Sequence, residues 1–192
     1  MRFLFIGDSI TVGMSPTLGR YMLSLGVESE IVSRISMTAE DAVTDELVIS
    51  ALRDRRPSCV VVLLGTNPIG RTDLERFRMS VRALRRLVYT YCDRLAWVSP
   101  WAGDDAVARL EILREEIGFR VANGSILAGD LQRAGENQVH FTSEAYVPLS
   151  WRVAEWSVRV ADSRALTTPR SGAKIVSVLG LLGAAVVPLF VR

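Results

Sequence analysis

The sequence predicts an α/β fold, a flavodoxin-like three-layer sandwich in which helices cover both faces of a central parallel sheet. Short apolar runs alternate along the chain with stretches of helical periodicity, which is typical of βαβ units. The run Cys59–Leu64 has no polar alternation, as expected for a strand covered on both faces. A length of 192 residues, with 49% hydrophobic and 23% charged residues, fits one globular domain.

The first half of the chain begins with a predicted strand at Arg2–Ile6. Ser15-Pro16 then predicts a helix start, with serine as the cap and proline at the first helical position, and Gly26 ends that helix. Glu30–Ser33 is a second short strand. Thr38–Asp41 resembles a helix cap, and the apolar residues that follow it at helical spacing are Val43, Leu47 and Leu52.

The second half continues the alternation after the strand Cys59–Leu64. Thr72–Glu75 has the pattern of a capping box and starts a helix that runs to about Tyr91. The later predicted elements are a strand at Leu95–Val98, a helix from about Asp104 to Ile117, an irregular or weakly extended stretch at Val121–Leu127, and a helix from about Ser143 to Ala161.

The composition excludes several classes of function. The net charge of +2 gives no electrostatic reason to expect a nucleic-acid partner. We interpret the cluster Arg82, Arg85 and Arg86 as a solvated helix face, the alternative being a surface for a phosphate or an acidic ligand. Cys59 and Cys92 form no disulfide framework and are expected to be buried thiols. With a single histidine and two separated cysteines, no metal site is predicted.

Polar residues with catalytic chemistry follow two of the predicted strands. Ser9 comes directly after the first strand and Asn67 after the strand Cys59–Leu64, so both belong at the carboxyl edge of the sheet, where ligands bind in such folds. A serine held at a strand end is a candidate nucleophile. His140 is the only histidine, so an imidazole of this chain that activates Ser9 must come from it.

Together these residues resemble the SGNH (GDSL-type) hydrolases over roughly residues 1–162. The resemblance rests on Gly7-Asp8-Ser9, Gly65-Thr66-Asn67 and His140, which are weak signals singly but specific in this order and at strand ends. It implies that Ser9 attacks an ester carbonyl and that His140 accepts the proton. It also implies an oxyanion hole made by the Ser9 backbone N–H, the Asn67 side-chain amide and a backbone N–H near Met37. No cofactor is implied.

The chain departs from the family pattern at three positions. Asn137 stands three residues before His140, where the family has an acid; its carbonyl can orient the imidazole but adds no charge, and Glu136 or another acid is the alternative. Met37 or a neighbour stands where the family has a glycine, and Pro68 where an acidic residue usually follows Gly-Thr-Asn.

Four residues beside these motifs are candidates for substrate contact: Asp8, Thr11, Pro68 and Trp101. For Asp8 the alternative is a structural role, bonding nearby backbone, and for Trp101 it is core packing. The motif residues also have ordinary interpretations, with Ser9 as a cap, Asn67 as a turn residue and His140 as a loop histidine.

The function that we favour from the sequence is hydrolysis of a small ester, an acetyl group on a carbohydrate or a lipid acyl chain. One alternative is O-acyl transfer through the same acyl-enzyme. Another is a catalytically weak SGNH-like protein that serves for binding or as a scaffold at a membrane. The sequence leaves the oligomeric state open.

The end of the chain differs in composition from the rest. Residues 163–174 are polar and are predicted to be a linker, and residues 175–191 are almost wholly apolar. As a helix, this segment would reach about 26 Å against a hydrocarbon core of about 30 Å, with Arg170, Lys174 and Arg192 at the interfaces. We expect no secretory signal and a cytoplasmic domain, attached to a membrane by this segment; the alternative is packing on protein.

Overall fold

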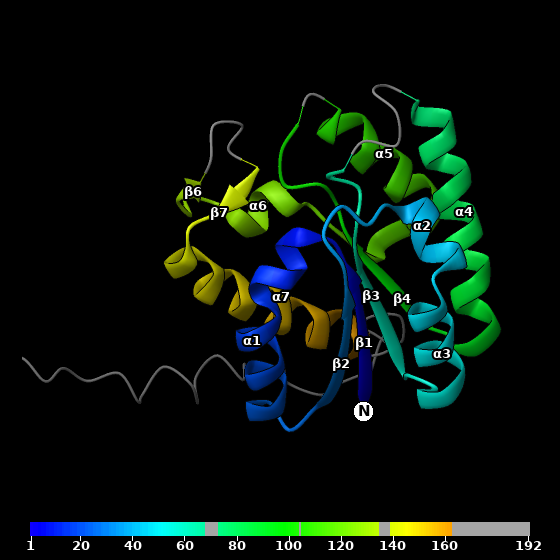
Figure 1. Cartoon of the computed structure of the whole chain (residues 1–192), viewed down its shortest axis with the longest axis horizontal. Coiled ribbons are helices and arrows are strands. Elements are labelled where there is room, and N and C mark those ends of the chain that lie inside the picture. Colours follow the sequence, from blue (N-terminus) through cyan, green and yellow to red (C-terminus); the bar gives the residue numbers. More distant parts are fainter. Residues whose placement is uncertain (68–72, 104, 135–138, 163–192) are drawn as a thin grey trace, which may run out of the picture. The chain divides into compact units, whose positions relative to one another are not determined.

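A five-stranded parallel sheet forms the centre of the protein in a computed structural model, which describes residues 1–67, 73–103, 105–134 and 139–162. The strands lie in the order β2-β1-β3-β4-β5 (Figure 1). Their bounds are β1 Arg2–Gly7, β2 Glu28–Ser33, β3 Cys59–Leu63, β4 Leu95–Val98 and β5 Val121–Ala122. This arrangement, with helices on both faces, confirms the predicted flavodoxin-like α/β fold.

Helices connect the strands, and a small antiparallel hairpin stands apart from the sheet. The helices are α1 Ser9–Ser24, α2 Ala39–Thr44, α3 Glu46–Arg55, α4 Leu74–Tyr91, α5 Ala106–Ile117, α6 Gly124–Ala128 and α7 Ser143–Asp162, with a 3-10 turn at Gly118–Arg120. The hairpin consists of β6 (Arg133–Ala134) and β7 (His140–Phe141), in which Ala134 is opposite His140.

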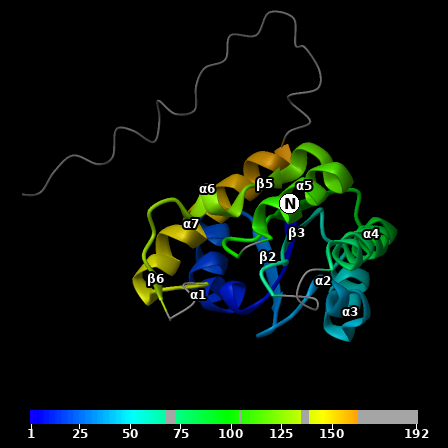
Figure 2. The same ribbon diagram turned by 90° about the horizontal axis from the view of Figure 1, so that it is seen from above.

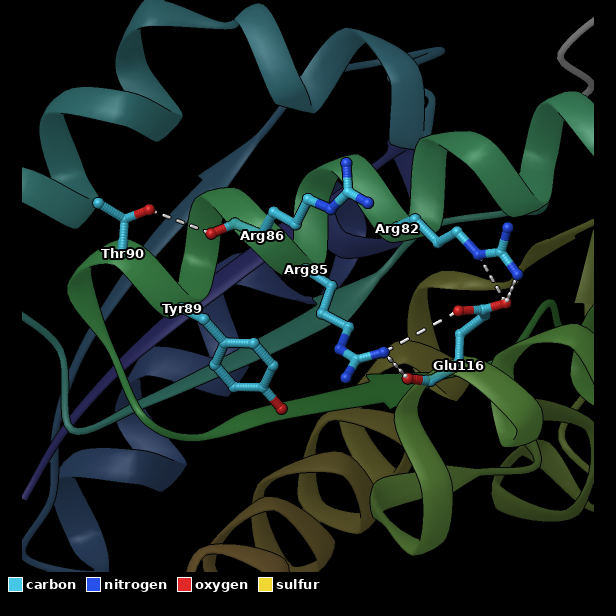
Figure 3. A pocket seen from close by; sticks show the side chains of 6 residues that line it. All are labelled: Arg82, Arg85, Arg86, Tyr89, Thr90 and Glu116. Carbon is cyan, nitrogen blue, oxygen red and sulfur yellow. Dashed lines mark hydrogen bonds and ion pairs between the residues drawn. The ribbon is translucent and has the colours of Figure 1, made fainter.

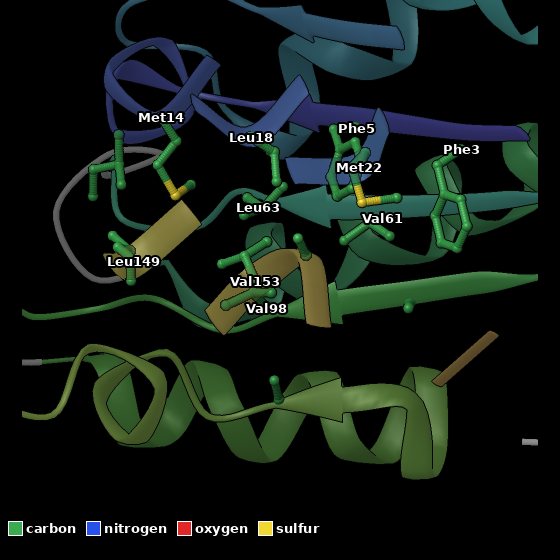
Figure 4. Packing of buried hydrophobic residues seen from close by; sticks show 14 of the residues in the cluster. Phe3, Phe5, Met14, Leu18, Met22, Val61, Leu63, Val98, Leu149 and Val153 are labelled. Carbon is green, nitrogen blue, oxygen red and sulfur yellow. The ribbon is translucent and has the colours of Figure 1, made fainter. Parts of the chain in front are cut away.

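Two apolar layers hold the helices against the sheet, because alternate strand residues point to opposite faces. One layer packs α1 and α7 on the sheet (Figure 4) and includes Phe3, Phe5, Met14, Leu18, Met22, Val61, Leu63, Val98, Leu149 and Val153. The other packs α2 to α5 on the opposite face and includes Leu4, Ile6, Val48, Leu52, Val62, Phe77, Val81, Leu84, Trp97 and Leu113. Figure 2 shows α1 and α7 on one side of the strands and α2, α3 and α4 on the other.

The start of α1 differs from the prediction, which placed it at Ser15-Pro16. The helix begins at Ser9, and Asp8 caps it by accepting a hydrogen bond from the Ile10 N–H at 3.0 Å. Pro16 lies inside the helix, where proline cannot donate to a carbonyl one turn earlier. Burial of an apolar stripe against the sheet outweighs that loss. Ser9 is therefore fixed in the first turn of a helix.

Other boundaries also needed tertiary information. The stretch after Thr38 is divided into α2 and α3 at Asp45, whose carboxylate accepts from the N–H groups of Leu47 and Val48 and starts a new helix. The stretch Val121–Leu127 contains β5 and most of α6. The β6–β7 hairpin was not predicted. Both cysteines are buried thiols, as expected.

The C-terminal predictions, a linker at 163–174 and an apolar segment at 175–191, lie outside the described residues. Within the part of the chain that the structure describes, none of the helices has the length and hydropathy needed to cross a membrane.

Candidate active site

The predicted motifs meet at the carboxyl edge of the sheet. In the strand order β2-β1-β3-β4-β5, the chain turns in opposite directions from β1 and β3, and the crevice outside such a switch point is the usual ligand site of open α/β sheets. Ser9 follows β1, and Asn67 follows β3. The topology therefore places both residues at the position where this fold binds ligands.

Ser9 and His140 are in direct contact although 131 residues separate them in sequence. Ser9 Oγ lies 2.9 Å from His140 Nε2. Ser9 is half-buried in the first turn of α1, and the exposed His140 reaches it from β7. With the imidazole proton on Nδ1, Nε2 accepts the Ser9 hydroxyl proton, which is the geometry of a nucleophile and its general base.

Asn67 is held on its side-chain amide by two acceptors. Its Nδ2 donates to Asp8 Oδ2 at 3.3 Å and to the Met37 carbonyl oxygen at 3.1 Å. The Met37 N–H donates to the Arg34 carbonyl oxygen at 3.1 Å, in a turn that includes Ser36 at φ 63°. Met37 is thus joined to Asn67 through its carbonyl, and its N–H, the predicted oxyanion donor, is already bonded within the turn.

Asp8 connects the two motifs from a buried position. Its carboxylate accepts from the Ile10 N–H on one oxygen and from Asn67 on the other, and only 1% of the residue is exposed. Burial raises the pKa of Asp8 to about 6, against the lowering effect of backbone hydrogen bonds that include those of Ile10 and Thr11. Burial likewise raises the pKa of the half-buried Tyr146, and the charge of Asp8 adds to that effect.

The other predicted substrate contacts are not at the surface of the site. Thr11 is fully buried, and Trp101 is 2% exposed and packs edge-to-face on Phe141, with ring centroids 6.0 Å apart. Asp8, Thr11 and Trp101 therefore belong to the support of the site. Two further predicted residues, Asn137 at the acid position and Pro68, lie outside the described residues.

One residue of the site had no role in the sequence-based prediction. Arg109 on α5 is 5% exposed, and its Nη1 donates to the carbonyl oxygens of Gly65 at 2.7 Å and Asn67 at 3.3 Å. Its position in a predicted helix gave no signal, because an arginine is ordinarily placed on the exposed face.

A separate hollow of about 510 Å³ lies between α4 and α5, away from these motifs (Figure 3). Arg82, Arg85, Arg86 and Glu116 are among the residues that line it. Glu116 accepts hydrogen bonds from Arg78 and Arg82, and its backbone carbonyl accepts one from Arg85. Arg82 and Arg85 of the predicted cluster, together with Arg78, are thus engaged with Glu116 in an ion-pair network between two helices.

Solved structures share this architecture. Esterase EstA from Pseudoalteromonas sp. matches with a TM-score of 0.66 and 16% identity, covering 87% of this chain and 99% of its own. A family 3 carbohydrate esterase from Clostridium thermocellum matches with a TM-score of 0.59 and 14% identity, covering 88% of this chain and 99% of its own. A GDSL-family lipolytic protein from Desulfitobacterium hafniense has a TM-score of 0.63 and 16% identity, covering 81% and 98%.

The fold is that of the SGNH hydrolases. The C-terminal catalytic domain of peptidoglycan O-acetyltransferase A from Streptococcus pneumoniae is a further match, with a TM-score of 0.62 and 17% identity over 84% of this chain and 94% of its own. No protein-family profile and no curated protein matches the sequence. At these identities the likeness to SGNH proteins establishes the fold, so the chemistry has to be argued from the site.

The stability of Asp8→Asn relative to the wild type is expected to increase as the pH rises. Because the folded state raises the pKa of Asp8 from 3.8 to about 6, Asp8 favours folding while protonated, and this contribution is lost as the pH rises through about 6. Asparagine cannot ionise. The free energy of unfolding of Asp8→Asn minus that of the wild type should therefore increase by roughly 2–3 kcal/mol between pH 4 and pH 7.5. Urea unfolding at several pH values measures this difference.

Asp54→Asn is the control for that measurement. Asp54 is exposed, and the hydrogen bond from Arg53 lowers its pKa, so its contribution to stability is lost as the pH falls. The same difference for Asp54→Asn should change in the opposite direction, and only weakly, because the pair is screened by solvent. If the difference in unfolding free energy between Asp8→Asn and the wild type did not change with pH, Asp8 would not be a buried carboxylate with a raised pKa.

Proposed function

We propose that this protein is a serine ester hydrolase that acts through an acyl-enzyme on Ser9. The observation that carries the proposal is the distance of 2.9 Å between Ser9 Oγ and His140 Nε2 at the switch point of an SGNH fold. A serine hydroxyl is a poor nucleophile at neutral pH unless a base accepts its proton. His140, the single histidine of the chain, is that base.

The reaction follows from this pair in two halves. Ser9 Oγ attacks the ester carbonyl carbon while its proton passes to His140 Nε2, and the imidazolium then protonates the departing alkoxide. The acyl group remains bonded to Oγ. A water molecule then attacks the acyl carbon while its proton passes to His140. The imidazolium returns that proton to Oγ as the bond between Oγ and the acyl carbon breaks, which releases the carboxylic acid and the free serine.

The oxyanion of each tetrahedral intermediate needs donors beside Ser9. N–H groups in the first turn of a helix have no carbonyl partner within the helix, so the N–H of Ser9 is available by position. The Asn67 amide is the second donor. Both of its N–H bonds are used in the resting site, and the longer one, 3.3 Å to Asp8, is the one that an oxyanion would replace.

The asparagine at the acid position, Asn137, makes His140 a weaker base than in an enzyme with an acid there. We infer that Asn137 orients the imidazole through its carbonyl, without the charge that would stabilise the imidazolium. In a serine triad the exchange of aspartate for asparagine has cost about 10⁴ in turnover. Slow turnover with a reactive serine is therefore the expected behaviour.

We propose an acylated carbohydrate as the substrate class. The similar structures include a family 3 carbohydrate esterase, an esterase active on acetylated mannans and a peptidoglycan O-acetyltransferase domain. The last of these supports a second candidate, acyl transfer in which a sugar hydroxyl replaces water at the acyl-enzyme. Release of acetate from an acetylated sugar, with and without an acceptor sugar, separates hydrolysis from transfer. A lipid acyl ester is the other substrate class predicted from the sequence.

A fluorophosphonate tests the proposal without a choice of substrate. The full chain should gain one adduct, which peptide mapping places on Ser9, and the adduct should be lost in His140→Ala. Ser143→Ala is the matched control, because Ser143 is an exposed serine in the first turn of α7, and it should label like the wild type. A folded wild-type protein that is not labelled would instead favour the binding or scaffold role.

A further inference from the structure

Arg109 is a buried cation whose ion pair within the described part of the chain, to Asp105, is long. The residue is 5% exposed, and the nearest described carboxylate oxygen, Asp105 Oδ2, lies 3.8 Å from its Nη2. Burial lowers the pKa of Arg109, but an arginine stays protonated in proteins. A buried charge is expensive unless its hydrogen bonds are satisfied, so the acceptors of this guanidinium are of interest.

Those acceptors belong to the loop that carries Asn67. Nη1 donates to the Gly65 carbonyl oxygen at 2.7 Å and to the Asn67 carbonyl oxygen at 3.3 Å. The guanidinium also lies over the Phe77 ring, 5.1 Å from its centroid. Nη1 of Arg109 is thus paired with backbone oxygens of the loop, while Nε is buried without a hydrogen-bond partner among the described residues. The loop depends on this guanidinium for two of its hydrogen bonds.

The same loop is fixed from the strand side as well. Trp97 Nε1 donates to the Leu64 carbonyl oxygen at 2.9 Å. Gly65 has φ +123°, a conformation that favours glycine, and a Cβ there would lie 3.2 Å from Pro100 and 3.3 Å from Phe77. The backbone around Gly65 therefore has little space to move, and the hydrogen bond from Arg109 fixes the direction of the Gly65 carbonyl group.

We infer that Arg109 is a positioning residue that holds the Asn67 backbone so that the side-chain amide points to the oxyanion site. Arg109 contacts the carbonyl of Asn67, while Asp8 and Met37 contact its amide, so the residue is held at both ends. The inference rests on the proposed function, because it concerns the donor of the proposed oxyanion hole. It gives α5, which holds none of the motifs, a part in catalysis.

Kinetics of the full chain test this role. Arg109→Met should lower kcat for p-nitrophenyl acetate by about 10- to 100-fold, since a displaced catalytic donor typically costs up to about 10². KM should change little, because the amide is needed in the transition state. Arg109→Lys keeps a cation that can reach one carbonyl, so it should recover part of kcat. Arg114→Met, at an exposed arginine of the same helix, should behave like the wild type.

A double-mutant cycle separates positioning from general damage. If Arg109 acts through Asn67, adding Arg109→Met to Asn67→Ala should lower kcat by less than about twofold further. A full 10-fold or larger further loss would mean that Arg109 acts by another route, and the inference would be overturned. Unchanged kcat in Arg109→Met alone would overturn it too.

NMR gives a readout that does not require activity. The side-chain amide signal of Asn67, assigned by its loss in Asn67→Ala, should shift or broaden in Arg109→Met and Arg109→Lys but not in Arg114→Met. An unmoved signal would reject the role of Arg109. A shifted signal in a protein whose Ser9 is not labelled by fluorophosphonate would instead show that the proposed function has failed and the positioning has not.

Discussion

His140→Ala is expected to lower kcat for a small aryl ester by about 10²-fold. A serine triad supplies roughly 10⁶ in turnover, and an asparagine at the acid position has already removed about 10⁴ of it. His140 Nε2 is 2.9 Å from Ser9 Oγ, and the chain has no second histidine to replace it. In serine hydrolases, removal of the base costs about as much as removal of the nucleophile, because the two act as a unit. Stopped or steady-state assays with p-nitrophenyl acetate measure kcat directly.

Ser9→Ala and the double variant complete this experiment. The loss in Ser9→Ala should be as large as that in His140→Ala, and the double variant should be no worse than either, since one missing partner already stops the reaction. Circular dichroism should report the wild-type fold, because neither side chain is in the core. If His140→Ala kept most of the wild-type kcat while Ser9 remained the labelled residue, a different base would serve Ser9.

Gly7→Ala is expected to destabilise the protein by about 1–3 kcal/mol or more. A Cβ at Gly7 would lie 1.9 Å from Oγ1 and 2.4 Å from Cβ of Thr11, a distance at which atoms must move. Gly7 ends β1, and Thr11 is fully buried in α1, so neither side has space to yield. Overpacking of a filled core typically costs this amount. Urea unfolding measures it, and Ser9 reactivity should fall with it, because Ser9 lies between the two residues.

Gly19→Ala is the matched control, with the opposite sign. Gly19 lies in α1, the helix that Gly7 precedes, and a Cβ there would meet no atom within 4 Å. Alanine in a helix interior is favoured over glycine by roughly 0.5–1 kcal/mol, so Gly19→Ala should stabilise the protein. Equal effects of the two substitutions would contradict the packing at Gly7.

The sequence predicted the parts of the site that follow strands. Apolar runs located β1 and β3, and their ends located Ser9 and Asn67, because a parallel sheet aligns its carboxyl ends. His140 followed from being the only histidine. These predictions needed only local patterns and topology, which is why they could be made.

The supporting residues could not be predicted, because their roles depend on long-range contacts. From the sequence, Arg109 is expected on the exposed face of a helix, but in the structure it is buried and bonded to Gly65. Met37 was assigned a donor N–H, but the turn at Ser36 uses that N–H and presents the carbonyl to Asn67. Ser15-Pro16 is a strong local start signal that the cap at Asp8 and the buried face of α1 override.

Trp101, which the sequence suggested as a substrate contact, instead supports the hairpin that carries His140. Each strand of the β6–β7 hairpin is two residues long, and Arg133 of β6 also donates a hydrogen bond from Nη2 to the Trp101 carbonyl oxygen at 2.9 Å. The hairpin is also anchored by Phe141, which packs edge-to-face on Trp101 and on Tyr146 and lies under Arg133. The position of the imidazole is therefore set by the packing of these rings together with the contacts of Arg133. Substitutions among the rings would change the distance between Ser9 Oγ and His140 Nε2, and with it the rate of the proposed proton transfer, while every polar group of the site stays in place.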